Sequence, residues 1–336
     1  MAIRGRQERG VELTQFHIVF SQLVGMAVMM LVGIVCVKAH VLGQKAMDGI
    51  CSFILKVGIP FIVFSNAVSG TTRADLAQSG VIMLLDIVMY VLLISMCTLI
   101  AKLMGLKAER GRMFCGTFVF GNVGFMGLPL LMALYPGKGA LYFALLSLVD
   151  QCVMWTYGVW TCKKVRDVHS RTDKDPARGW LQRVRSVISP ALVAVALSLV
   201  VVLIGVPIPE EVLAPIKAIG QTASPLSMVY LGGLVVLRDW TGVLRKPELY
   251  VGVVLKMLLF PMALFALFTT VPPMLGLTIN PDIVHTMAIC AGMPTMVALV
   301  MFAEKEHNQP QYAIGMVVAN TIASLFTLTA VSFVVF

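Results

Sequence analysis

The sequence predicts an all-α integral membrane protein with ten transmembrane helices in two inverted repeats of five. Three features lead to this fold class: an apolar composition, long apolar runs, and glycine and proline clusters that recur in corresponding runs. Of the 336 residues, 58% are hydrophobic and 13% are charged, and this charged share is about half that of a soluble domain. A soluble fold of this size cannot bury so much apolar surface in one core, whereas a bilayer accepts it.

Each predicted span is a continuous apolar run of about 20 residues, the length that a helix needs to cross the hydrocarbon. The runs lack the alternation of polar and apolar residues that is typical of a membrane β-barrel. The predicted spans are 14–37, 48–69, 79–101, 112–134, 139–161, 187–206, 213–236, 248–270, 282–303 and 312–335.

Lysine and arginine set the orientation of the spans, because cytoplasmic connections carry an excess of both. With the N-terminus outside, most of the 26 basic residues fall in the inner connections. The N-terminal arm, with Arg4, Arg6 and Arg9, is the exception. We therefore expect a multi-pass protein of the cell inner (cytoplasmic) membrane with both termini outside. The net charge of +9 then reflects orientation in the lipid bilayer, and no nucleic-acid partner is expected.

The longest polar stretch, 163–186, divides the chain into a first five-helix repeat at 1–162 and a second at 187–336. We expect this stretch to be a solvated cytoplasmic loop, with a regulatory or lipid-binding role as the alternative. Because each half contains an odd number of spans, the second half is inverted in the membrane relative to the first.

Glycine and proline interrupt the fourth and ninth spans, which occupy corresponding positions in the two halves. The interrupting residues are Gly121, Gly124, Gly127 and Pro129 in the fourth span and Gly292 and Pro294 in the ninth. Proline removes a backbone donor, and unpaired backbone survives in a membrane only where protein or a water-filled cavity covers it. The pattern predicts two broken, crossing helices whose half-helix N-termini suit a carboxylate, with simple kinks as the alternative.

Three motifs in these spans resemble one known family. The motifs are Asn122-Val-Gly-Phe-Met126-Gly127-Leu-Pro129-Leu-Leu in the fourth span, Gln151-Cys152-Val-Met-Trp155 in the fifth, and Pro294 followed eight residues later by Phe302-Ala303 in the ninth. Together with the plan of ten spans around one loop, they resemble the auxin efflux carrier family. That family includes the plant PIN auxin carriers and bacterial permeases for malate, malonate and similar acids.

The chain departs from the plant pattern in ways that favour the bacterial branch. Its central loop is short, so the long regulated loop of many plant carriers is missing. Val123 and Gly124 replace the pair usual after the plant asparagine, and Gly121 stands where the plant members have a proline. These differences make a small dicarboxylate a better expectation than auxin itself.

The resemblance implies an elevator-type architecture. Spans 1, 2, 6 and 7 form a static scaffold, which also provides the interface of a homodimer, and spans 3–5 and 8–10 form the moving transport domain. Asn122 then lies at the crossing and helps to hold the substrate. The expected substrate-binding residues are Asn122, Gly124, Gly127, Pro129, Gln151, Gly292, Pro294 and Thr295.

Few ionisable residues lie within the apolar runs, and such residues usually face a cavity and act there. Asp86 lies at a distance before Asn122 similar to that of an acid in the plant members, so the resemblance makes it the candidate proton carrier. Lys256 holds a comparable place in the second half, and a static salt bridge between the two is the alternative. Asp150 with Asn320 forms either an oxygen-rich cation site or a helix–helix hydrogen bond.

We therefore expect secondary active or facilitative transport of a small organic anion, either a dicarboxylate such as malate or malonate or an auxin-like monocarboxylate. The sequence contains no phosphate-binding glycine loop for ATP and no metal-ligand spacing, so no cofactor is expected beyond coupling to protons or sodium. A membrane-embedded sensor or channel is the first alternative. An intramembrane enzyme is the second, and we do not expect it because no convergent catalytic side chains are visible.

Overall fold

The computed structural model describes residues 2–70, 80–164, 189–205, 207–274 and 276–336. In these ranges the backbone is helical between short connections, and the β-type pairing is one isolated bridge between Gly121 and Thr295. The fold is therefore all-α, as the sequence predicts. The loop expected at 163–186 lies outside the described residues except for its first two, Lys163 and Lys164.

Within the described residues, seven helices are long and apolar enough to cross a membrane, which makes this a multi-pass membrane protein. They are Phe20–Lys38, Gln44–Ser69, Gly80–Leu103, Gly139–Cys162, Glu210–Leu237, Pro247–Met274 and Pro310–Val335. A shorter apolar helix occupies Pro190–Ile204. The first helix begins at Ala2, well before the predicted start of the span at 14, because the helix continues through the basic arm.

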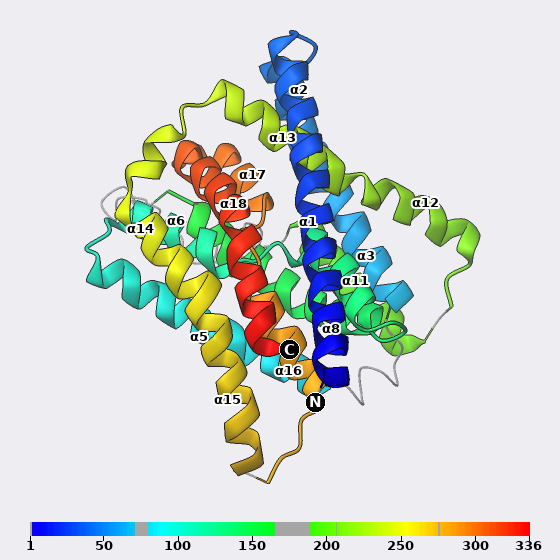
Figure 1. Ribbon diagram of the computed structural model, residues 1–336. Coiled ribbons are helices and arrows are strands. Elements are labelled where there is room, and N and C mark those ends of the chain that lie inside the picture. Colours follow the sequence, from blue (N-terminus) through cyan, green and yellow to red (C-terminus); the bar gives the residue numbers. More distant parts are fainter. Residues whose placement is uncertain (1, 71–79, 165–188, 206, 275) are drawn as a thin grey trace, which may run out of the picture.

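The helices form two groups, which lie side by side in Figure 1 with α12 at one flank and α5 and α14 at the other. The first, the glycine-packed group, contains α1 (Ala2–Lys38), α2 (Gln44–Phe53), the π-helix η1 (Ile54–Gly58), α3 (Ile59–Gly70), α11 (Pro190–Ile204), α12 (Glu210–Gln221) and α13 (Ala223–Leu237). In this group α1 packs along α13, and α3 packs against α11 and α12.

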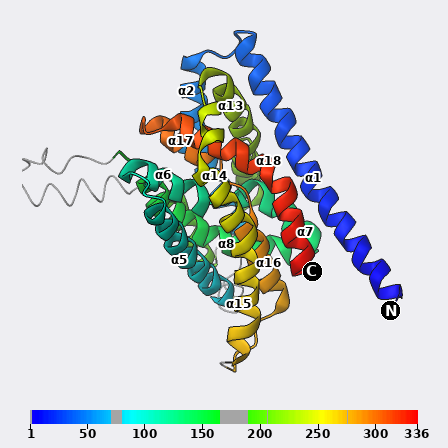
Figure 2. The same ribbon diagram turned by 60° about the vertical axis from the view of Figure 1, so that its left-hand side comes forward.

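The second, the crossing group, comes from the middle of each half. It contains α5 (Gly80–Leu103), α6 (Ala108–Val119), η2 (Val123–Gly127), α7 (Leu128–Leu134), α8 (Gly139–Val153), η3 (Met154–Gly158), α9 (Val159–Cys162), α14 (Pro247–Gly252), η6 (Val253–Leu259), α15 (Phe260–Met274), α16 (Pro281–Gly292), α17 (Ala298–Lys305) and α18 (Pro310–Val335). The short 3₁₀ helix η5 (Thr241–Arg245) connects α13 to α14. Figure 2 shows α5 and α6 on the side of the molecule away from α1, whereas α18 lies next to α1.

Glycine lets the helices of the first group approach closely. A Cβ atom on Gly33 of α1 would lie 2.0 Å from the carbonyl oxygen of Val229, and one on Gly232 of α13 would lie 2.1 Å from that of Met30. Two helices can approach this closely only where no side chain separates their backbones. Small residues at such contacts are the usual means of helix association in a bilayer.

Proline accounts for three of the π-helical turns. The segments η1, η2 and η6 each end two residues before a proline, at Pro60, Pro129 and Pro261 respectively. A proline lacks the N–H that would bond the preceding turn, and its ring crowds that turn, so the ladder widens locally. One of these widened turns, η2, lies directly beside the interruption between α6 and α7.

Candidate functional site

Two interrupted helices meet at the centre of the crossing group. Between α6 and η2, the N–H of Asn122 donates to the carbonyl oxygen of Pro294 at 2.6 Å. Between α16 and α17, the N–H of Met296 donates to the carbonyl oxygen of Phe120 at 3.1 Å. These bonds frame the bridge between Gly121 and Thr295. The two predicted interruptions are confirmed, and they pair with each other.

The positions of the interruptions differ slightly from the prediction. The first begins at Phe120, one residue before the predicted Gly121, and residues 123–127 form a π-helix. The second occupies 293–297 and includes the predicted Pro294, whereas Gly292 is still the last residue of α16. Met293 has an extended ψ of 146° because a residue before proline avoids the helical region. The helix α16 therefore ends at Gly292, two residues before Pro294.

Asn122 is the most unusual side chain at the crossing. It is fully buried, and neither its amide nitrogen nor its amide oxygen has a hydrogen-bond partner among the described residues. A buried polar group without a partner is costly, so each one requires an explanation. The nearby Gly124 has open space where a Cβ would be. Gly124 is two residues after Asn122 in the sequence, and the Asn122 amide offers both donors and an acceptor.

Thr295 already uses its hydroxyl hydrogen. The hydroxyl donates to the carbonyl oxygen of Thr117 at 2.5 Å and accepts from Nδ2 of Asn320 at 2.6 Å. In this conformation the hydroxyl hydrogen of Thr295 is therefore not available to a substrate. Its observed role is to tie α18 and α6 to the interruption before α17. The oxygen Oδ1 of Asn320 has no hydrogen-bond partner among the described residues.

A cluster of acids lies beside the crossing on α5 and α8. The hydroxyl of Tyr90 donates to Oδ1 of Asp150, and Nε2 of Gln151 donates to Oδ2 of Asp150 at 3.2 Å. Asp86 lies one turn before Tyr90, is close enough to Asp150 to interact electrostatically, and leaves its Oδ2 without a described partner. The ring of Tyr90 lies 5.9 Å from that of Phe120, so the cluster contacts the crossing.

Two alternative contacts of these residues are absent from the described structure. No ion pair joins Asp86 to Lys256 there, because the ammonium group of Lys256 donates to the carbonyl oxygen of Met293. This contact places a buried cation at the C-terminal end of α16, where the helix dipole favours it. Asp150 and Asn320 bond to separate partners, so no hydrogen bond joins the two among the described residues.

The remaining predicted residues shape the crossing or belong to the acid cluster. A Cβ on Gly127 would lie 2.9 Å from Cγ1 of Val123, and one on Gly292 would lie 3.4 Å from Cγ of Pro261. Pro129 starts α7. Gln151 belongs to the acid cluster, where its Oε1 accepts from Nε1 of Trp155 at 3.1 Å.

The sequence analysis missed several residues that complete the site. A hydroxyl donor comes from Tyr90 and a carbonyl acceptor from Thr117. The aromatic ring beside the acid cluster is that of Phe120. Tyr90 was within reach of sequence reasoning, because it stands four residues after Asp86 and therefore on the same helix face.

A multi-pass helical protein with an unsatisfied polar group at the crossing of two broken helices belongs to the class of membrane transporters. A comparison with protein families agrees. The family described as membrane transport protein matches residues 18–178 and 180–332. The chain belongs to this family, which includes the auxin efflux carriers, and the resemblance noted in the sequence is confirmed. No curated protein matches the sequence.

Proposed function

We propose that this membrane transporter carries a small organic anion across the cytoplasmic membrane by secondary active or facilitative transport. The substrate is a dicarboxylate such as malate or malonate, or an auxin-like monocarboxylate. The observation that carries the proposal is the buried amide of Asn122, unpartnered within the described residues. A carboxylate that leaves water needs hydrogen-bond donors at its new position.

Further positive potential at the crossing supports an anionic substrate. The segment η2–α7 begins at Val123 and α17 begins at Ala298, so two helix N-termini lie beside the interruptions. The first N–H groups of a helix lack intrahelical partners and attract anions. Lys256 adds a buried ammonium group at Met293. The field of these groups opposes a cation in the same place.

The proposed architecture has ten spans in two inverted five-helix repeats. The broken span formed by α16 and α17 in the second repeat would correspond to the one formed by α6 and α7 in the first. The glycine-packed group would be the scaffold, with a homodimer interface, and the crossing group would move as an elevator. Support comes from the packing: α1 packs along α13 and α3 packs against α11 and α12, while the polar crossing lies entirely in the other group. Both termini would be outside. Asp86, Asp150, Lys256 and Asn320 would couple transport to protons or sodium.

An uptake panel tests the substrate class. Purified protein in proteoliposomes would be offered malate, malonate, succinate, lactate and auxin under imposed proton and sodium gradients. We expect saturable uptake of at least one dicarboxylate. Currents far above carrier rates would instead indicate a channel.

Asn122→Ala tests the site. Losing one hydrogen bond to a charged group costs roughly 1.5–3 kcal/mol, so affinity for the transported acid should fall by roughly tenfold to a hundredfold. Thermal stability without substrate should change little, because the amide has no partner to lose. Asn66→Ala, in the glycine-packed group, is the matched control and should bind as the wild type does. Wild-type affinity in Asn122→Ala would place the substrate elsewhere.

A further inference from the structure

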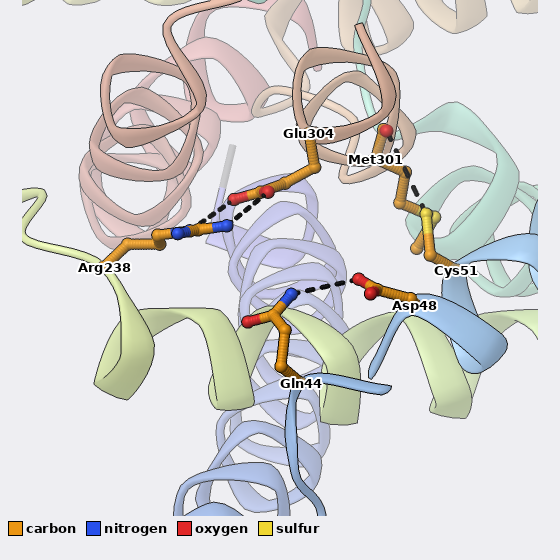
Figure 3. Close-up of polar contacts among 6 residues, drawn as sticks. All are labelled: Gln44, Asp48, Cys51, Arg238, Met301 and Glu304. Carbon is orange, nitrogen blue, oxygen red and sulfur yellow. Dashed lines mark hydrogen bonds and ion pairs between the residues drawn. The ribbon is translucent and has the colours of Figure 1, made fainter. Parts of the chain in front are cut away.

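Arg238 and Glu304 connect the two helix groups at one end of the molecule. Arg238 directly follows α13, and Glu304 lies in the last turn of α17. The guanidinium donates from Nε to Oε1 and from Nη2 to Oε2 of Glu304, both at 2.9 Å (Figure 3). A fork of two parallel bonds fixes the relative geometry of its partners as well as their charge.

A second contact holds α17 from α2. The sulfur of Cys51 lies 4.0 Å from the carbonyl oxygen of Met301, and the thiol side chain is buried. Asp48, about one turn earlier on α2, accepts from Gln44 at 3.0 Å and also acts electrostatically on Arg238. Figure 3 shows these residues of α2 beside the ion pair. At this end, therefore, α17 is held by two helices of the glycine-packed group.

The other described ion pair has a different place in the fold. Arg110 and Glu248 join α6 to α14, both in the crossing group, so a rigid movement of that group leaves this pair intact. The same movement separates Glu304 from Arg238. We propose that the Arg238–Glu304 pair is a lock that holds α17 against α13 and α2 in this conformation and opens in each transport cycle. This inference rests on the movement between helix groups in the proposed function.

The surroundings of Arg238 make the lock reversible. Its side chain is 32% exposed, whereas that of Glu304 is 10% exposed. After Glu304 leaves, the guanidinium still has water and the nearby Asp48 to compensate its charge. The opening therefore leaves Arg238 compensated, and its cost falls mainly on Glu304, the more buried partner.

Two native cysteines can report whether the lock is closed. One contacts α17 from the glycine-packed group and the other contacts it from within the crossing group. Cys51 contacts it from α2, whereas the sulfur of Cys162, in α9 of the crossing group, lies 3.8 Å from the carbonyl oxygen of Leu299. The experiment measures the labelling rate of each cysteine by a membrane-permeant thiol reagent, without substrate, using mass spectrometry. Arg238→Gln should speed labelling of Cys51 by about threefold to tenfold and leave Cys162 unchanged, because the open population rises. The control is Arg245→Gln, an exposed charge in the same connection.

Exchange of the two charges completes the test. The double variant Arg238→Glu with Glu304→Arg should return Cys51 to the wild-type labelling rate. An unchanged rate for Cys51 in Arg238→Gln overturns the lock. Equal acceleration of Cys51 and Cys162 also overturns it, because the pair would then stabilise the whole fold. Since the assay contains no substrate, a failed uptake panel counts against the proposed substrate and leaves this result intact.

Discussion

In the glycine-packed group the helices meet backbone to backbone, whereas in the crossing group they meet through hydrogen bonds. Gly33 and Gly232 bring α1 and α13 so close that a Cβ on either would meet main-chain atoms of the other helix. The hydroxyls of Ser65, Ser198 and Ser227 bond back to carbonyl oxygens of their own helices. The association of these helices therefore depends on shape, as is common in lipid.

In the crossing group, buried polar side chains form hydrogen bonds between helices. Thr295 links α6 and α18, and Tyr90 links α5 to Asp150 on α8. Lys256 links η6 to the end of α16. A satisfied buried network fixes a unique arrangement, while any member left unsatisfied is available to a ligand. The difference suggests a division of labour in which one group supplies a frame and the other supplies the solute site.

The prediction with the largest expected effect tests whether close backbone contact at a glycine holds α1 against α13. Gly232→Ala puts a methyl group 2.1 Å from the carbonyl oxygen of Met30, so α1 and α13 must separate. We expect a loss of about 3 kcal/mol or more, since even modest overpacking costs 1–3 kcal/mol. The measurement is the temperature at which the detergent-solubilised protein stops eluting as a single species.

Gly25→Ala on the exposed face of α1 is the matched control, because a Cβ there meets nothing within 4 Å. Alanine is the better helix former, so this control should be neutral or slightly stabilising. Equal tolerance of both substitutions would mean that close backbone contact does not hold the first group together.

The second prediction concerns the coupling of transport to an ion gradient, and its residue lies in the crossing group. If Asp86 carries the coupling proton, Asp86→Asn should abolish accumulation of the transported acid against its gradient and leave most of its exchange across the vesicle membrane. Counterflow and gradient-driven uptake in the same proteoliposomes separate the two activities. Glu211→Gln, an exposed acid in the glycine-packed group, should affect neither. Equal loss of exchange and accumulation would assign Asp86 a folding or binding role.

The interruptions were predictable from sequence because their causes are local. Pro294 lacks a backbone donor and restricts Met293, so α16 must end there whatever surrounds it. The glycines around Asn122 weaken the other helix by a different local cause, because glycine loses more conformational freedom in a helix than any other residue. Prediction erred only by a few residues, since the bridge between the two breaks adds Phe120 and Gly121 to the extended stretch.

The partners of the buried charges were not predictable, because they depend on the rotation and depth of helices far apart in the chain. Similar spacing before the two breaks left a static salt bridge between Asp86 and Lys256 open as an alternative. In the structure the ammonium group of Lys256 instead reaches Met293, a main-chain acceptor that exists only because α16 ends early. Spacing along one helix gives the face of a residue, and only packing gives its neighbour on another.

The smallest effect tests whether the hydrogen bonds of the crossing position its helices. Thr295→Val keeps the volume of the side chain but leaves Nδ2 of Asn320 and the carbonyl oxygen of Thr117 without their partner. An unsatisfied buried group costs roughly 1–3 kcal/mol, so thermal stability should fall by that amount, less than for Gly232→Ala. Adding Asn320→Leu removes the stranded amide and should recover part of the loss, since neighbouring substitutions are not additive.

The control is Thr329→Val, because the hydroxyl of Thr329 bonds to the carbonyl oxygen of Leu325 in its own helix, and this change should have little effect. Full additivity of Thr295→Val and Asn320→Leu would show that the two side chains act independently, and the crossing would then be held by its main-chain bridge alone.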